Sequence, residues 1–225
     1  PELDDKFKTP VYGYSKTELT ADATVTVTNE RKETSLTVNK TVESMLNADK
    51  NKTWNFTVTV DGKAVNADGQ QNANITVSNG SGSITVSHLP MGASVTVAEE
   101  LGDDAAAFTT TVNNVSGTET TLTLGTSNTV KVVNTRKTRK LTITKVVEST
   151  LVADKTTLVY EFTYEYMDGT NKVSNTVTIT GAGTYTADGK EYIELPYGVE
   201  VTVTETPAAG MTTTIEDSFG TASDG

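Results

Sequence analysis

"TVTVTNERKETSLTVNKTVESML" (residues 24–46) and "TVKVVNTRKTRKLTITKVVESTL" (residues 129–151) are two copies of one pattern. In both copies, apolar residues alternate with Thr and other polar residues, which is the period of a β-strand with one buried face. Further segments match in the same order: "LPMGASVTVAEE" from Leu89 with "LPYGVEVTVTET" from Leu195, and "FTTTV" from Phe108 with "MTTTI" from Met211. The chain is therefore a tandem repeat.

Turn signals separate these short alternating runs. Asp or Asn followed by Gly favours the tight turns of β-hairpins. Such pairs occur at Asp61-Gly62, Asp68-Gly69, Asn79-Gly80, Asp168-Gly169 and Asp188-Gly189. No helical period is sustained between them. We therefore predict an all-β chain of tandem Ig-like β-sandwich domains with about seven strands each.

The repeat frame predicts the domain boundaries. Residues 36–136 form one complete sandwich, and residues 137–225 begin a second sandwich that lacks its last strand. Residues 1–35 carry the C-terminal strand or strands of a preceding or neighbouring repeat.

The composition excludes several classes of protein. Twenty-nine acidic residues against 18 basic ones give a net charge of −11, which disfavours nucleic acid and anionic membranes as partners. At 35% hydrophobic and 6% aromatic, each unit buries only a thin core. The chain has no cysteine, so disulfides do not staple these cores. Another kind of staple would be useful outside the cell.

Catalytic and metal-binding sets are also hard to assemble from these residues. His88 is the only histidine, which argues against a Ser-His-Asp triad or a His-rich metal site. Asn47, Asp49 and Asn51 alternate as in a calcium loop, but the Gly and acidic residue that an EF-hand requires are missing. We expect no cofactor, no metal and no turnover enzyme.

Three polar residues fall on the apolar faces of predicted strands in the first unit: Lys40, Glu99 and Asn134. The apolar residues of those faces are Leu36, Val38, Val42, Val95, Val97, Val130 and Val132. Glu100 is adjacent to Glu99, but strand alternation favours Glu99. A lysine, a glutamate and an asparagine are thus predicted to point into one core.

The second unit repeats part of this set, with Lys145 and Glu205 at the matching positions. Residues 206–225 contain no matching asparagine. Asn29, in the N-terminal segment, has the same strand parity as Asn134. The second set is therefore completed only from the other end of the chain.

Such a trio has a specific chemistry available to it. Burial favours a neutral Lys amine and a protonated Glu, because both charged forms lose hydration. A neutral amine is a nucleophile, and a protonated carboxyl can polarise an amide. We hypothesise a single-turnover autocatalytic reaction in which the Lys amine displaces ammonia from the Asn side chain. The alternative is an unreacted buried ion pair with Asn completing its hydrogen bonds, but recurrence of the set at matched positions favours the reaction.

The segments "LTVNK" and "LTITK", the two "LP" segments quoted above, and "VKVVNTRK" and "VTVTNERK" resemble the Cna B-type and streptococcal pilin-type (FctA-like) isopeptide domains of Gram-positive pili and adhesins. The resemblance implies Lys40–Asn134 and Lys145–Asn29 isopeptide bonds, with Glu99 and Glu205 as catalytic acids. It also implies an extracellular, cell-wall-anchored structural subunit or stalk of a surface fibre. The alternative function is an adhesin or ligand-binding module on the same scaffold.

The strand missing from residues 137–225 and the extra strand in residues 1–35 predict that the chain binds copies of itself or neighbouring repeats. The N-terminal strand of one molecule could complete residues 137–225 of a neighbouring copy by strand addition and place Asn29 beside Lys145. Alternatively, neighbouring repeats of a longer tandem array supply the missing strand.

Overall fold

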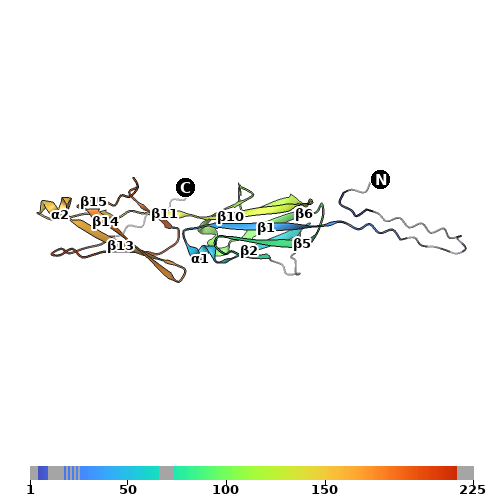
Figure 1. The fold of residues 1–225 in the computed structure, drawn as a ribbon, viewed down its shortest axis with the longest axis horizontal. Coiled ribbons are helices and arrows are strands. Elements are labelled where there is room, and N and C mark those ends of the chain that lie inside the picture. Colours follow the sequence, from blue (N-terminus) through green and yellow to red (C-terminus); the bar gives the residue numbers. More distant parts are fainter. Residues whose placement is uncertain are drawn as a thin grey trace. The chain divides into compact units, whose positions relative to one another are not determined.

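The computed structural model describes residues 5–9, 18, 20, 22, 24, 26–65 and 73–216. The chain divides into two compact units, Pro1–Lys137 and Thr138–Gly225, called unit 1 and unit 2 below (Figure 1). Strands dominate both units, and the α-helices α1 (Asn47–Lys50) and α2 (Val152–Thr156) are single turns. The prediction of an all-β tandem chain is confirmed.

The first sheet of unit 1 contains both ends of the predicted domain. Its strand order is β5 (Ser81–Pro90), β1 (Glu33–Glu43), β10 (Asn128–Arg136), β7 (Phe108–Val112) and β8 (Val115–Ser116). β1 and β10 are parallel neighbours, and the other pairs are antiparallel. The first and last long strands of the unit therefore lie side by side (Figure 1).

The second sheet of unit 1 covers the first. Its order is β3 (Lys63–Ala64), β2 (Thr53–Val60), β6 (Ser94–Glu100) and β9 (Glu119–Thr123), and β4 (Ala73–Thr76) also pairs with β2. A 3-10 helix, η1 (Gly102–Ala106), follows β6.

The core of unit 1 lies between these two sheets. Leu36 and Val38 from β1 and Val132 from β10 belong to one buried cluster with Phe56 and Val97 of the second sheet. Alternation of buried and accessible residues along β2 and β10 produces these inner faces. Two sheets packed face to face on one apolar core form the predicted sandwich.

One predicted turn illustrates how local sequence closes the sandwich. Asn79 and Gly80 both have positive φ, 54° and 83°, a region that suits Asn and Gly. A Cβ on Gly80 would lie 2.9 Å from the carbonyl oxygen of Val42, so the turn packs closely against the end of β1. The Asp68-Gly69 turn lies outside the described residues.

The described part of unit 2 follows only part of this plan, with smaller sheets. The three-stranded sheet has the order β14 (Asn171–Thr180), β13 (Val159–Asp168) and β17 (Val201–Glu205). Two short pairs join β11 (Thr138–Leu141) to β16 (Ile193–Pro196) and β12 (Thr144–Lys145) to β15 (Gly183–Thr184). Its buried core cluster consists of Ile143, Tyr160, Phe162 and Ile179.

Within residues 138–216, unit 2 has no strand that corresponds to β7 or β10 of unit 1. The segment 211–216, which contains the counterpart of β7, forms no strand. Val146, Leu151 and Val152 are more than half exposed. The edge of β12 opposite β15 has no partner strand among these residues.

Before β1 begins at Glu33, the described part of the N-terminal segment forms no strand. Residues 26–30 have no regular secondary structure, and Asn29 is exposed. An isolated bridge joins Phe7 to Arg31, beside backbone hydrogen bonds from Lys8 to Glu30 and from Lys32 to Lys6.

Candidate functional site: a buried Lys-Glu-Asn trio

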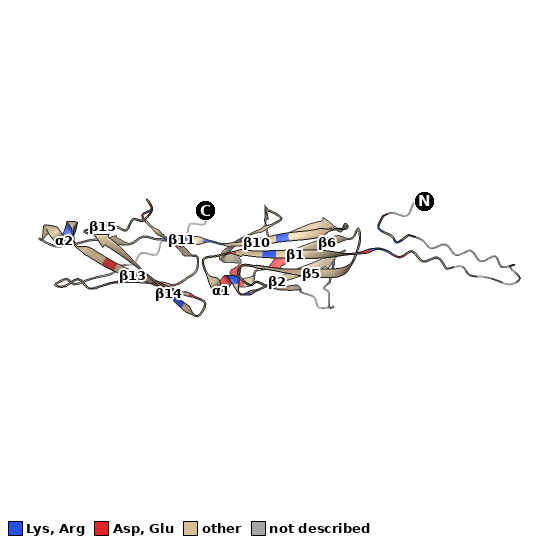
Figure 2. Ribbon diagram, in the orientation of Figure 1, with Lys and Arg blue, Asp and Glu red and all other residues tan. Residues whose placement is uncertain are grey.

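Lys40 lies on the inner face of β1. Its neighbours on that face, Val38 and Val42, are core residues, and Lys40 itself is only 1% exposed. Figure 2 shows that the strands of unit 1 carry few charged positions, with basic residues on β1 and on β10. Within β10, Lys131 is exposed and Arg136 ends the strand, so Lys40 differs from Lys131 in facing the core.

Glu99 and Asn134 reach the same place from different sheets. Lys40 Nζ lies 2.7 Å from Glu99 Oε1, and both side chains are fully buried. Asn134 Nδ2 donates to the same Glu99 oxygen at 3.0 Å. Asn134 pairs in register with Val42, two residues beyond Lys40, because β10 runs parallel to β1. The structure therefore brings together the three residues predicted for unit 1.

The neighbouring acid, Glu100, points away from this site. It is exposed on the opposite face of β6, where Thr57 donates a hydrogen bond to its carboxylate. Strand alternation thus separates the two adjacent glutamates.

Two polar atoms of the trio have unused hydrogen-bonding capacity. Among the described residues, Lys40 Nζ and Glu99 Oε2 make no hydrogen bond of good geometry, although Nζ touches Oε1. The Trp54 ring lies 4.9 Å from Nζ and closes one side of the amine. The amine is thus enclosed by an aromatic ring and the apolar core, with the Glu99 carboxyl as its charged contact.

The ionisation of the pair follows from this burial. Burial lowers the pKa of Lys40 from 10.5 to about 8, against the opposing effect of the Glu99 charge. Burial also raises the pKa of Glu99, and the close Lys40 charge and the hydrogen bond from Asn134 only partly offset that rise. Both shifts favour the uncharged pair.

Thr110 is a fourth member of the site that the sequence prediction missed. Its hydroxyl donates to Asn134 Oδ1 at 2.8 Å, and the residue is 7% exposed. The signal was present in "FTTTV", because Thr110 lies between Phe108 and Val112 on the buried face of β7. An inward-facing threonine is easily overlooked, since its hydroxyl is small and threonine is common in strands.

Unit 2 contains the corresponding ion pair. Lys145 Nζ donates to both carboxylate oxygens of Glu205, at 2.7 and 3.0 Å. The Tyr160 ring lies 4.5 Å from Lys145 Nζ, in the place that the Trp54 ring takes at 4.9 Å from Lys40 Nζ. Within residues 138–216 no asparagine is hydrogen-bonded to this pair. Asn29 is exposed in unit 1, so the described structure does not place it in a site.

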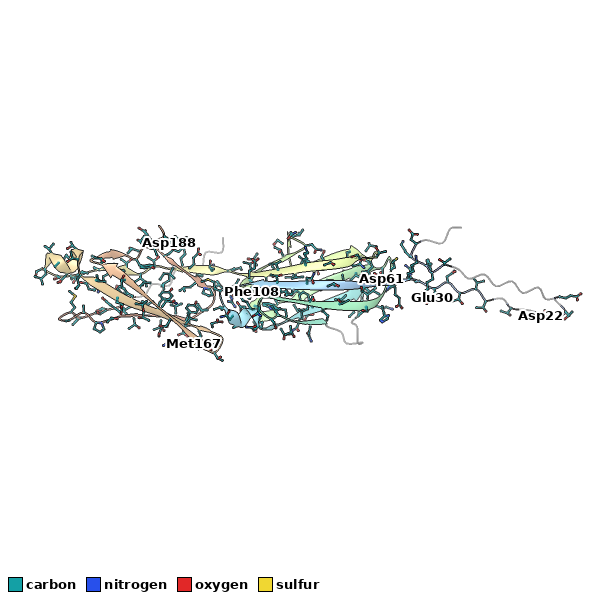
Figure 3. The ribbon with its side chains drawn as sticks, in the orientation of Figure 1. Asp22, Glu30, Asp61, Phe108, Met167 and Asp188 are labelled. Carbon is teal, nitrogen blue, oxygen red and sulfur yellow. The ribbon has the colours of Figure 1, made fainter. Side chains whose placement is uncertain are left out.

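A second polar contact fixes the end of β10. Arg136 donates through Nε and Nη2 to the buried carboxylate of Asp49, the latter at 2.8 Å, and Ser44 donates to the same carboxylate. The Arg136 guanidinium also lies 4.8 Å from the Phe108 ring, which is labelled in Figure 3. In unit 2, Ser149 donates to Asp154 in the same way. No arginine joins them within residues 138–216.

The fold and the buried trio define a tandem β-sandwich protein with a lysine, a glutamate and an asparagine in contact in the core of its first unit. The chain belongs to the family DUF5979, a domain of unknown function, whose model matches residues 36–137 and 141–224. No curated protein matches the chain.

Solved structures with detectable similarity include two adhesins. The pilus-presented adhesin Spy0125 (Cpa) is 23% identical with a TM-score of 0.34, over 48% of this chain and 28% of that one. An adhesin from Mobiluncus mulieris that contains intramolecular disulfide, isopeptide and ester bond cross-links is 24% identical with a TM-score of 0.32, over 48% of this chain and 42% of that one. The chain thus spans less than half the length of either adhesin chain.

Across the described residues, no helix has the length and apolar character needed to cross a membrane.

Proposed function

We propose that this chain is a segment of an extracellular structural protein, a stalk or fibre of a bacterial cell surface, whose units are locked by Lys-Asn isopeptide bonds. The observation that carries the proposal is the buried trio of unit 1. Glu99 Oε1 contacts both the amine of Lys40 and the amide nitrogen of Asn134 inside the core. A merely stabilising core would gain as much from apolar residues at these positions.

The proposed reaction uses only these side chains. The neutral amine of Lys40 adds to the side-chain carbonyl carbon of Asn134 and forms the new C–N bond. Glu99 accepts a proton from Nζ and delivers a proton to Nδ2. The bond from the carbonyl carbon to Nδ2 then breaks, and ammonia leaves. One amide replaces another, so no oxidant and no cofactor are consumed, and fixed proximity lowers the barrier by about 7–11 kcal/mol.

The bond would have a mechanical and a thermodynamic consequence. It would join β1 to β10, the first and last long strands of unit 1, so that tension on the unit passes through a covalent link. By analogy with a disulfide closing a loop of similar length, it restricts the unfolded chain and stabilises the unit by roughly 4–5 kcal/mol. This suits a fibre that has no cysteine.

Intact mass tests the proposal. The purified chain is expected to weigh less than its sequence by one ammonia for each bond formed. Lys40→Ala and Glu99→Ala are expected to restore the full mass and to lower the melting temperature of unit 1 by on the order of 10 °C. Lys131→Ala, on the exposed face of β10, is the matched control and keeps both the mass loss and the melting temperature. An unmodified wild-type mass would contradict the cross-link.

For unit 2, we propose that the free edge of β12 accepts a strand of the β10 type. In unit 1, β1 is flanked by both β5 and β10, whereas among the described residues of unit 2 strands β11 and β12 are paired on one side only. Lys145 of β12 pairs with Glu205, and Ser149, which follows β12 in the chain, donates a hydrogen bond to the Asp154 carboxylate.

The incoming strand should carry an asparagine and, two residues later, an arginine. Asn134 and Arg136 have this spacing, and their partners Glu99 and Asp49 correspond to Glu205 and Asp154. Asn29 and Arg31 have the same spacing. Residues 24–32 of a second copy fit this requirement, as does a matching strand of a neighbouring repeat.

A further inference from the structure

We infer that Thr110 is a catalytic residue of the cross-linking reaction, which donates a hydrogen bond to Asn134 Oδ1 and stabilises the negative charge that forms there as Lys40 adds. This inference rests on the proposed function.

The geometry fixes the roles of the two amide atoms of Asn134. Thr110 is the register partner of Asn134 across the β7–β10 pair, so its hydroxyl is held beside the amide by the backbone ladder. A carbonyl oxygen can only accept, so the Thr110 hydroxyl must donate its proton to Oδ1, at 2.8 Å. Nδ2 meanwhile donates to Glu99. The oxygen that becomes charged faces Thr110, and the nitrogen that leaves faces the acid.

The charge redistribution explains why this hydrogen bond would matter to the rate. When the amine adds to the carbonyl carbon, the π-electron pair moves onto Oδ1, which becomes an oxyanion. A hydrogen bond to an ionised acceptor is about twice as strong as one to a neutral carbonyl, so Thr110 stabilises the transition state more than the starting amide. Thr110 keeps its proton throughout, and the carbonyl re-forms as ammonia leaves. The buried position strengthens the effect, since little water screens it.

The second repeat has a threonine at the matching position, Thr213 in "MTTTI". In the described structure Thr213 is exposed and lies in no strand. For unit 2 to react in the same way, residues 211–215 must therefore form a β7-like strand together with the incoming β10-like strand.

The test compares Thr110→Val with Thr110→Ser. Each chain is made by cell-free synthesis, samples are quenched in acid and denaturant at increasing times, and the loss of one ammonia is followed by intact mass. Val keeps the shape of Thr without its hydroxyl, so bond formation should slow by about 10–1,000-fold. Ser keeps the hydroxyl and should retain a rate within a few-fold of wild type. A Thr110→Val chain that reacts at the wild-type rate would overturn the inference.

A folding defect is separated from a catalytic one in the Lys40→Ala background, where no bond forms in unit 1. There, urea unfolding measures what Thr110→Val does to the stability of the unit alone. The inference requires that Thr110→Val chains fold and still form the bond slowly. If Thr110→Val chains form the bond at the wild-type rate under conditions in which they are fully folded, Thr110 has only a structural role. If the wild-type chain itself loses no ammonia, the proposed function fails and not merely the role of Thr110.

Discussion

Lys40 occupies surroundings that an ammonium group normally avoids. The side chain is fully buried on a strand face that it shares with core valines, the Trp54 ring lies beside its amine, and Glu99 is its ion-pair partner. Holding this lysine charged costs folding energy, because burial removes its hydration. The unfolded chain, with a pKa of 10.5, binds the Lys40 proton more tightly than the folded chain, with a pKa of about 8.

This difference predicts a pH dependence in a chain that cannot react. In Asn134→Ala, which has no amide to attack, the unfolded state holds more protons than the folded state between about pH 8 and 10.5. The free energy of unfolding of unit 1 should therefore rise with pH across that window. Urea unfolding at pH 8 and pH 10 measures it, and Asn134→Ala/Lys40→Met should show no such rise. A flat or falling profile in Asn134→Ala would contradict a lowered Lys40 pKa.

At the scale of elements, the position of β10 decides whether the trio can meet. The strand is paired through its backbone with β1 and β7, and its end is tied to α1 by the Arg136–Asp49 ion pair. That ion pair lies two residues beyond Asn134. It thus resists fraying of the strand next to the Asn134 amide.

Arg136→Met tests this anchor. The substitution leaves the Asp49 carboxylate buried with Ser44 as a remaining partner, which should destabilise unit 1 by about 3 kcal/mol. The measurement is urea unfolding in the Lys40→Ala background, where a cross-link cannot mask the loss. Lys131→Met, on the exposed face of the same strand, is the control and should change stability by less than about 0.5 kcal/mol. Equal effects of the two substitutions would show that the ion pair does not anchor β10.

At the scale of the whole molecule, the two units differ in how much of the sandwich and of the Lys-Glu-Asn trio their described residues contain. Unit 1 has a complete sandwich and a complete trio, while the described part of unit 2 has the acid and the lysine but no asparagine hydrogen-bonded to them. Exposed Val146, Leu151 and Val152, together with a strand edge that has no partner strand among the described residues, support the proposal that unit 2 accepts another strand.

A synthetic peptide of residues 24–32 tests this acceptor directly. Mixed with the chain, it should form an adduct whose mass is the sum of the two minus one ammonia, and the wild-type chain alone should form covalent oligomers on boiled denaturing gels. Lys145→Ala and a peptide with Asn29→Ala should abolish the adduct, whereas Asn55→Ala in the chain, on the exposed face of β2, should not. An adduct without oligomers favours a neighbouring repeat over a second copy as the natural donor. If neither product forms, strand complementation is wrong.

The all-β fold and the inward direction of Lys40, Glu99 and Asn134 were predictable from sequence, because both depend on an alternation of two that the backbone imposes on every strand. The same rule distinguishes Glu99 from Glu100. The rule also applied to Thr110. Threonine is common on both faces of strands, however, so its alternation alone does not distinguish a functional threonine from the others.

Other properties depend on which strands become neighbours. Lys40, Glu99 and Asn134 touch because β1 pairs in parallel with β10 and β6 packs across the core. The order of strands in a sheet cannot be read from the alternation of residues within one strand. The hydroxyl of Thr110 on Asn134 Oδ1 likewise follows from the β7–β10 register. Sequence alone determined which side chains face inward, since that is a property of each strand; the tertiary structure decided which of them touch, since contact depends on how separate strands assemble.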